Sequence, residues 1–261
     1  LYSVNYEELN LSRPEIVRRI HEDYVRAGAQ VVETNTFGGN AIRLARHGFE
    51  DKVRAINARA VELAREAANG QAYVAGAIGP TGLVFGGVEN DPERVKRAFA
   101  EQATALVEAG VDLLLIETIR QPEELWLAID AVRGVAGHAV PLAAAVSIDD
   151  ELQMADGTDV LVIGEGLKAR GVDVLGVNCS TGPQQVLAAA EKLVPLGVPV
   201  VAMPNAGLPR RVDERFLYVA TPEYFGVYAR RMLKLGVKIV GGCCGTTPEH
   251  VRRIASAARM A

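Results

Sequence analysis

The chain has 261 residues, of which 49% are hydrophobic and 23% charged, and its formal net charge is −4. This composition is typical of a soluble globular protein, and no block of lysine and arginine provides a surface for nucleic acid or anionic membranes. No apolar run reaches the roughly 20 residues that cross a bilayer, and the first ten residues lack the features of a secretion signal. We therefore expect neither nucleic acid nor a membrane as a partner.

A glycine that ends a helical segment is repeatedly followed by a short run of branched apolar residues. Glycine suits the left-handed conformation that closes a helix, and the apolar run fits a strand buried on both faces. Five predicted strands carry this lead-in, and two others, at 72–79 and 140–147, share only the composition. In chain order the strands fall within 27–35, 72–79, 109–118, 140–147, 170–179, 196–205 and 235–244.

Eight predicted helices alternate with these strands. Five of them begin with Pro-Glu, because proline loses no hydrogen bond in the first turn and the acidic residue faces the positive helix end. The helices are predicted at 14–27, 51–68, 92–109, 122–135, 164–171, 184–195, 222–235 and 248–260.

Alternating strands and helices predict a parallel sheet with helical crossovers. The length matches an α/β fold of the (β/α)8 TIM-barrel type, which takes roughly 250 residues. Only seven strands are found, and the sequence opens on a helix that starts near Ser12. We expect residues 1–261 to form a single barrel domain that is incomplete at the amino terminus, with the first strand upstream. A seven-stranded or open doubly wound sheet is the alternative.

The three cysteines of the chain all stand at the ends of predicted strands. Cys179 ends one strand, and Cys243 and Cys244 end another. Barrel enzymes carry their chemistry at the carboxyl ends of the strands, so the three thiols are expected to meet at one face. Three thiols without a fourth ligand predict zinc with an open coordination position. Simple packing and a redox pair are the alternatives, although the spacing is not Cys-x-x-Cys. This use of cysteine predicts a reducing cytoplasm.

Two cysteine-containing segments carry a family resemblance. GVNCS at 176–180 and GGCCGTTPEH at 241–250 resemble the zinc signatures of the homocysteine S-methyltransferase family, which includes the homocysteine-binding module of methionine synthase and betaine–homocysteine methyltransferase. ETNTFGGN, AGAIGPTG, DLLLIET and PNAGLPR are similar to other family blocks. PNAGLPR resembles most the modules of methionine synthase or those joined to a methylenetetrahydrofolate reductase domain. The DGAMGT-like loop that opens the family is not found.

The resemblance implies a reaction and roles for five residues. Cys179, Cys243 and Cys244 would bind Zn²⁺, and the thiolate of L-homocysteine would take the fourth position and accept a methyl group, giving methionine. Glu117 would bind the substrate amino group, with an ion pair or a cap as the structural alternative. Asn205 would contact zinc or substrate near the sulfur, with a turn as its alternative.

Four other polar residues end predicted strands: Glu33, Asn35, Thr36 and Asn178. They could line the pocket, but turn chemistry explains them almost as well.

The resemblance leaves the methyl donor open among methylcobalamin, methyltetrahydrofolate, S-methylmethionine and betaine, and further domains of a longer polypeptide are possible partners. Two other functions are weighed. Glycines in GGVEN at 86–90 and near the carboxyl terminus suggest a barrel lyase or isomerase for a phosphorylated small molecule, although no strand ends in lysine. A zinc-stabilised module that only binds a partner is the third candidate.

Overall fold

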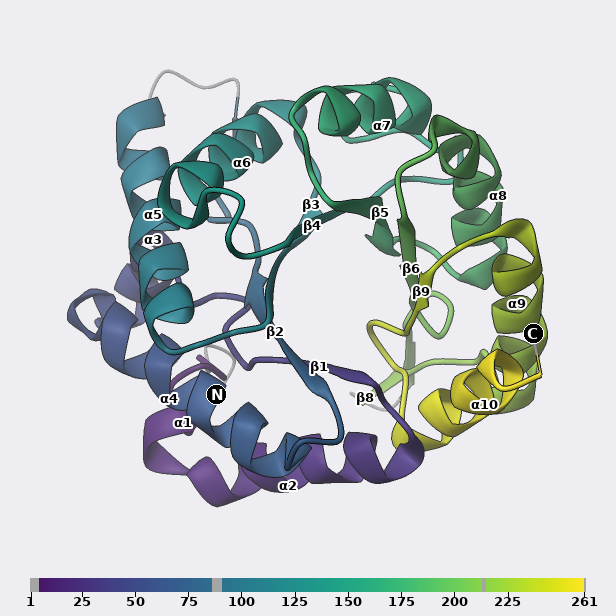
Figure 1. Cartoon of the computed structure of the whole chain (residues 1–261), viewed down its shortest axis with the longest axis horizontal. Coiled ribbons are helices and arrows are strands. Elements are labelled where there is room, and N and C mark those ends of the chain that lie inside the picture. Colours follow the sequence, from purple (N-terminus) through teal and green to yellow (C-terminus); the bar gives the residue numbers. More distant parts are fainter. Residues whose placement is uncertain (1–4, 86–90, 213–214, 261) are drawn as a thin grey trace. The chain divides into compact units, whose positions relative to one another are not determined.

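The computed structural model describes residues 5–85, 91–212 and 215–260. By their internal contacts the residues form two units, Leu1–Arg26 with Gln30–Leu142 and Ala27–Ala29 with Ala143–Ala261. In each unit, parallel strands carry helices along one side (Figure 1).

The first unit contains three parallel strands in the order β1 (Val31–Glu33), β2 (Tyr73–Ile78) and β3 (Leu113–Ile119). Ala75 is the register partner of both Glu33 and Leu113. The side chain of Asp91 accepts a hydrogen bond from the Glu93 amide, and Pro92 occupies the first helical position, which fixes where α5 begins. The helices are α1 (Leu9–Ser12), α2 (Pro14–Ala27), α3 (Ala41–Leu44), α4 (Val53–Ala68), α5 (Pro92–Glu108) and α6 (Pro122–Ala136), with the 3₁₀ helices η1 (Ala45–His47) and η2 (Glu50–Lys52).

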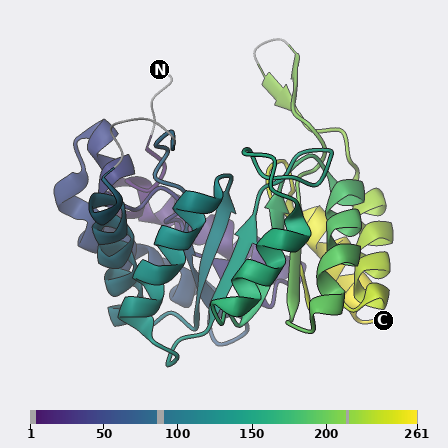
Figure 2. The same cartoon turned by 90° about the horizontal axis from the view of Figure 1, so that it is seen from above.

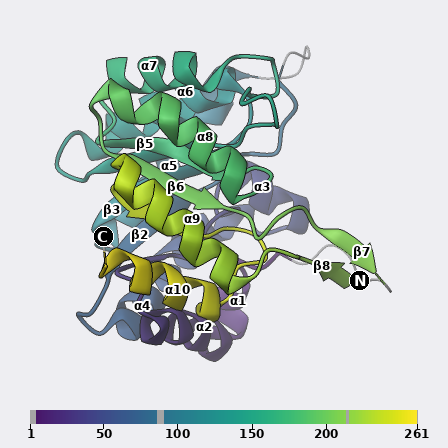
Figure 3. The same cartoon turned by 90° about the vertical axis from the view of Figure 1, so that its right-hand side faces the viewer.

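The second unit contains four parallel strands in the order β4 (Leu142–Val146), β5 (Val174–Cys179), β6 (Val200–Pro204) and β9 (Ile239–Val240). Its helices are α7 (Val160–Ala169), α8 (Pro183–Leu193), α9 (Pro222–Leu235) and α10 (Pro248–Ala258), with the 3₁₀ helix η3 (Val194–Leu196). Helices α8, α9 and α10 lie side by side (Figure 3). An antiparallel hairpin of β7 (Arg210–Val212) and β8 (Arg215–Leu217) projects from this unit (Figure 2).

A glycine sets the spacing of β5 and β6. A Cβ atom on Gly176 would lie 1.9 Å from the carbonyl oxygen of Val201 in the neighbouring strand. Only glycine therefore permits this approach, which brings the carboxyl end of β5, with Cys179, beside that of β6, with Pro204.

All seven predicted strands are present, three in the first unit and four in the second. The α/β class and the (β/α)8 TIM-barrel type are confirmed, with one parallel strand fewer than eight among the described residues. Helix α7 begins four residues before its predicted start because Asp159 caps it. The segment GGVEN at 86–90, on which the phosphate alternative partly rests, lies outside the described residues. None of the described helices combines the length and hydropathy needed to cross a membrane.

The buried His21 of α2 makes an acid-sensitive contribution to stability. Its side-chain Nε2 has no hydrogen-bond partner among the described residues. Burial lowers its pKa from 6.5 to about 4, because the charged ring would lose its hydration. The unfolded chain therefore binds a proton at a pH where the folded chain does not, and stability falls as the pH drops from 6.5 towards 4.

We expect His21→Phe to remove part of this acid sensitivity. Between pH 7 and pH 4.5 the loss in unfolding free energy should be roughly 2–3 kcal/mol smaller than in the wild type. Urea titrations at the two pH values measure this difference, and any constant effect of the larger ring cancels. Identical pH dependence in His21→Phe and wild type would contradict the assignment.

Candidate metal centre

The second unit brings the three cysteines together, as predicted from their strand ends. Cys179 is the last residue of β5, and Cys243 and Cys244 follow β9 after two glycines. The three Sγ atoms all lie within 4.8 Å of one another, and those of Cys179 and Cys244 are 3.9 Å apart. Among the described residues, no other group of three or more histidine, cysteine or acidic side chains converges in this way.

This cluster could hold a metal ion. A tetrahedral zinc site with Zn–S bonds of about 2.3 Å places its sulfurs roughly 3.8 Å apart. The 3.9 Å separation of the Cys179 and Cys244 sulfurs is close to that value. Cys179 and Cys243 are half-buried whereas Cys244 is exposed, so the cluster opens on one side. A set of thiol ligands favours zinc over magnesium or calcium.

The thiols of Cys179 and Cys243 hold their protons when no cation is near. The neighbouring Cys243 thiol lowers the pKa of Cys179, but hydrogen bonding with Cys244 and burial outweigh it, so the pKa of Cys179 is raised overall. Hydrogen bonds with Cys179 and Cys244, together with burial, raise the pKa of Cys243. Three thiolates this close would repel one another, which favours the protonated thiols. A divalent cation favours the thiolates instead, so metal uptake should release protons.

Strained backbone marks the strand ends where site residues are predicted. Cys179 and Ser180 are both left-handed, with φ of 57° and 62°, and Thr118 after Glu117 has φ of 59°. A branched residue such as threonine rarely adopts this conformation, and such strain concentrates at functional sites. The Ser180 hydroxyl helps to hold its turn, since it accepts a hydrogen bond from the Ile148 amide at 3.0 Å.

Asn205 joins the two cysteine-bearing segments. Its Nδ2 donates to the Ser180 carbonyl at 2.7 Å, and its Oδ1 accepts from the Cys244 amide at 3.0 Å. Its own amide donates to the carbonyl of Cys179 at 3.2 Å. The side chain is 6% exposed. In this structure Asn205 therefore holds the two cysteine-bearing segments together, and its predicted contact with zinc or substrate stays a prediction.

Tyr218 covers the turn that follows the cysteine pair, a contact that the sequence analysis did not predict. A Cβ atom on Gly245 would lie 2.1 Å from Cγ of the Tyr218 ring, so the ring packs directly on the glycine backbone. Burial first, and then the neighbouring Cys244, raise the pKa of Tyr218. Its phenol therefore stays protonated beside the sulfurs. The only signal in the sequence was the position of Tyr218 shortly after the PNAGLPR block.

Glu117 belongs to the first unit, on β3, and is 6% exposed. A buried carboxylate requires a cation or hydrogen-bond donors as partners, and the binding of the substrate amino group by Glu117 stays a prediction. Burial also raises the pKa of the half-buried Glu33, on β1, to about 7. Glu33 and Leu113 share the register partner Ala75, so they lie at the same height in the sheet. Glu117 lies four residues further along β3 than Leu113.

The other strand-end residues are engaged in structural hydrogen bonds or lie near the cysteines. Asn35 Nδ2 donates to the Tyr6 carbonyl at 2.7 Å, and the Thr36 hydroxyl donates to the Ala77 carbonyl at 2.7 Å. Asn178 is fully buried, with Nδ2 4.0 Å from the Cys243 sulfur. Turn and loop stabilisation therefore accounts for Asn35 and Thr36, while Asn178 belongs to the surroundings of the cysteine cluster.

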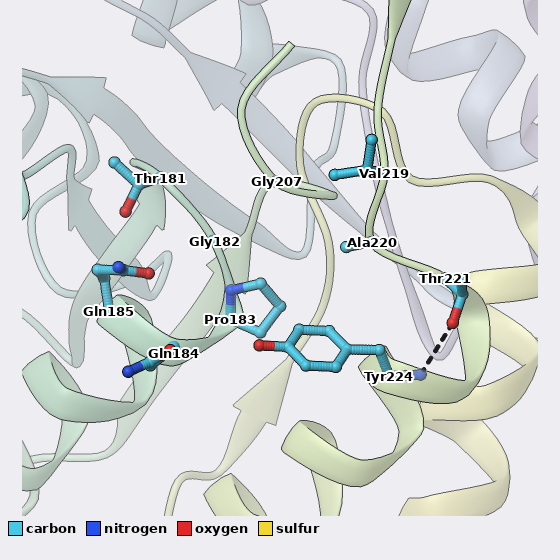
Figure 4. Close-up of a pocket in the computed structure, with 10 residues that line it drawn as sticks. All are labelled: Thr181, Gly182, Pro183, Gln184, Gln185, Gly207, Val219, Ala220, Thr221 and Tyr224. Carbon is cyan, nitrogen blue, oxygen red and sulfur yellow. Dashed lines mark hydrogen bonds between the residues drawn. The ribbon is translucent and has the colours of Figure 1, made fainter. Parts of the chain in front are cut away.

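A pocket of about 440 Å³ lies between the starts of α8 and α9 in the second unit. Two of its lining residues are near the cysteine-bearing segments in the sequence. Thr181 comes two residues after Cys179, and Gly207 comes two residues after Asn205. Across the pocket, the Tyr224 ring extends towards Pro183 (Figure 4). The complete lining is Thr181, Gly182, Pro183, Gln184, Gln185, Gly207, Val219, Ala220, Thr221 and Tyr224.

Comparison with known proteins identifies the family. A model of the homocysteine S-methyltransferase family matches residues 3–258. The chain belongs to this family of enzymes, as its cysteine signatures predicted.

Individual relatives agree. The chain is 34% identical over 263 residues to methionine synthase of Mycobacterium leprae (strain TN), covering 96% of this chain and 22% of that protein. Methionine synthase of Mycobacterium tuberculosis (strain ATCC 25618 / H37Rv) is 32% identical over 265 residues, with the same coverage. The metallated form of the homocysteine methyltransferase MmuM from Escherichia coli superposes with a TM-score of 0.80 at 26% identity, covering 95% of this chain and 86% of that one. The chain thus spans about a fifth of the length of the curated relatives it matches.

Proposed function

We propose that this chain transfers a methyl group to the sulfur of L-homocysteine, forming methionine, at a zinc centre held by Cys179, Cys243 and Cys244. The observation that carries the proposal is the convergence of three sulfurs within 4.8 Å in a member of the homocysteine S-methyltransferase family. That the similar homocysteine methyltransferase MmuM has a metallated form supports a metal in this chain as well. Residues 1–261 would form one homocysteine-binding domain, and a reducing cytoplasm would keep its thiols available.

A bound Zn²⁺ would lower the pKa of the substrate thiol, so that a nucleophilic thiolate exists at neutral pH. The three cysteines supply negative charge that keeps the incoming sulfur electron-rich. Asn205 and Ser180 fix the two cysteine-bearing segments relative to each other, which preserves an open position on the exposed side near Cys244. Displacement at a methyl carbon requires an in-line approach, so this fixed geometry carries much of the remaining catalysis.

Glu117 would orient the substrate through its ammonium group. A carboxylate–ammonium hydrogen bond is charge-assisted and about twice as strong as a neutral one. The donor is methylcobalamin, methyltetrahydrofolate, S-methylmethionine or betaine. Because the chain spans 22% of the curated methionine synthases, we propose that a further domain of a longer polypeptide presents the donor.

Metal analysis combined with a donor screen tests the proposal. We expect about one zinc ion per chain, loss of methionine formation after chelation, and recovery with Zn²⁺ but not Mg²⁺. Full turnover by metal-free protein would refute the zinc centre. A zinc-loaded protein that does not bind homocysteine would instead favour the partner-binding module.

A further inference from the structure

His250, in the first turn of α10, uses both of its ring nitrogens although it lies outside the metal centre. Nδ1 accepts from the Thr247 amide at 3.1 Å, and Nε2 lies 2.9 Å from the carbonyl oxygen of Ala220. An amide only donates and a carbonyl only accepts, so in these two bonds Nδ1 is the acceptor and Nε2 the donor. The side chain is 6% exposed and packs edge-on against Phe225. This environment fixes both the orientation and the tautomer of the ring.

The hydrogen bonds of His250 continue to the cysteine pair. The Ala220 amide donates to the Ala206 carbonyl at 3.0 Å, and the Ala206 amide donates to the Cys244 carbonyl at 2.8 Å. From Cys244 the chain runs through only two residues to Thr247, whose amide bonds to His250. These four hydrogen bonds and the short turn from Cys244 to Thr247 form a closed ring of contacts, which we call the circuit. His250 contributes both a donor and an acceptor to it through its side chain.

The circuit surrounds the turn on which Tyr218 rests. Gly245 lies inside it with φ of 80°, and the Tyr218 ring packs on its backbone. Tyr218 is two residues before Ala220, so the bond from His250 to the Ala220 carbonyl also holds the segment that carries Tyr218. Cys244 is exposed and belongs to this turn, so the backbone of the turn fixes where its side chain begins.

We propose that His250 is a positioning residue of the metal centre, which holds the Tyr218–Ala220 segment against the Cys243–Gly245 turn and thereby fixes the Cys244 sulfur. The inference rests on the proposed function in taking the cysteines as metal ligands. This role goes beyond capping α10. Nδ1 accepts the hydrogen bond that caps the helix, and Nε2 donates the hydrogen bond to Ala220 that closes the circuit. Groups that orient metal ligands in this way commonly affect metal affinity 10- to 100-fold.

Two substitutions separate the helix cap from the circuit. His250→Gln keeps an acceptor for the Thr247 amide and a donor for the Ala220 carbonyl. His250→Glu keeps the acceptor, which is the usual arrangement at this position of a helix, but turns a carboxylate oxygen towards the carbonyl. The probe is Cd²⁺, titrated into the full chain against a competing chelator and followed by its sulfur-to-metal charge-transfer absorption.

We expect His250→Gln to bind Cd²⁺ within about threefold of wild type and His250→Glu to bind roughly 10- to 100-fold more weakly. Ile254→Ala, which removes a buried side chain from the same helix, should lower the melting temperature but leave Cd²⁺ affinity unchanged. Wild-type affinity in His250→Glu, or equal losses in His250→Glu and Ile254→Ala, would overturn the positioning role alone. A wild-type chain without the sulfur-to-metal band would overturn the proposed metal centre itself.

Discussion

Replacing Cys244 with alanine is expected to remove the metal and reduce methyl transfer to homocysteine below detection. The proposed centre has three protein ligands, so Cys244→Ala would leave two sulfurs, those of Cys179 and Cys243. If the ligands share a binding free energy on the order of 10 kcal/mol, the loss of one costs about 3 kcal/mol, or roughly a hundredfold in affinity. The remaining site would also hold substrate in the wrong geometry. Zinc content after dialysis and the rate of methionine formation measure the two effects.

Folding should survive this change, because Cys244 is exposed. The melting temperatures of metal-free Cys244→Ala and metal-free wild type should therefore agree. Leu208→Ala is a suitable control, since its side chain is 57% exposed in the same unit and has no assigned role. Full zinc content and normal turnover in Cys244→Ala would show that the cysteines are not the metal ligands.

Glu117→Gln is expected to raise the KM for homocysteine roughly 10- to 100-fold while zinc content stays unchanged. The substitution preserves size and removes the negative charge that would bind the substrate ammonium group. A hydrogen bond to a charged group contributes about 1.5–3 kcal/mol, which corresponds to this range. Initial rates over a range of homocysteine concentrations, combined with metal analysis, give both quantities.

Glu124 provides a matched control for Glu117. It is also buried in the first unit, where its carboxylate accepts hydrogen bonds from the amide and hydroxyl of Thr81 at 2.7 and 2.6 Å. Glu124→Gln should lower stability without raising the KM, because its carboxylate already serves the loop that contains Thr81. An unchanged KM in Glu117→Gln would remove Glu117 from the substrate-binding residues.

Local signals account for the elements that the sequence predicted well. Helix α9 coincides with the predicted 222–235, because Thr221 caps its start and Gly236, with φ of 112°, ends it. The β7–β8 hairpin and the four-residue helices α1 and α3 were not predicted, since segments of three or four residues carry no measurable periodicity. Helix α1 depends on tertiary contacts instead, such as the hydrogen bond from the Asn10 side chain to the Asn35 carbonyl at 2.9 Å.

The same distinction applies to the site. Three rare cysteines at strand ends were enough to predict their convergence, because the topology of parallel strands places those ends together. The contacts of Tyr218 with Gly245 and of His250 with Ala220 join residues about 30 positions apart, and a sequence pattern does not specify such pairs. The two side-chain hydrogen bonds of Asn205 were not predicted either, because they join it to Ser180 and Cys244, which are distant in the sequence.

Zinc X-ray absorption spectroscopy on the zinc-loaded protein tests the metal centre most directly. Our account predicts three sulfur ligands at about 2.3 Å, increasing to four when homocysteine is added. A first shell of nitrogen and oxygen, or a sulfur count that does not respond to homocysteine, would contradict it.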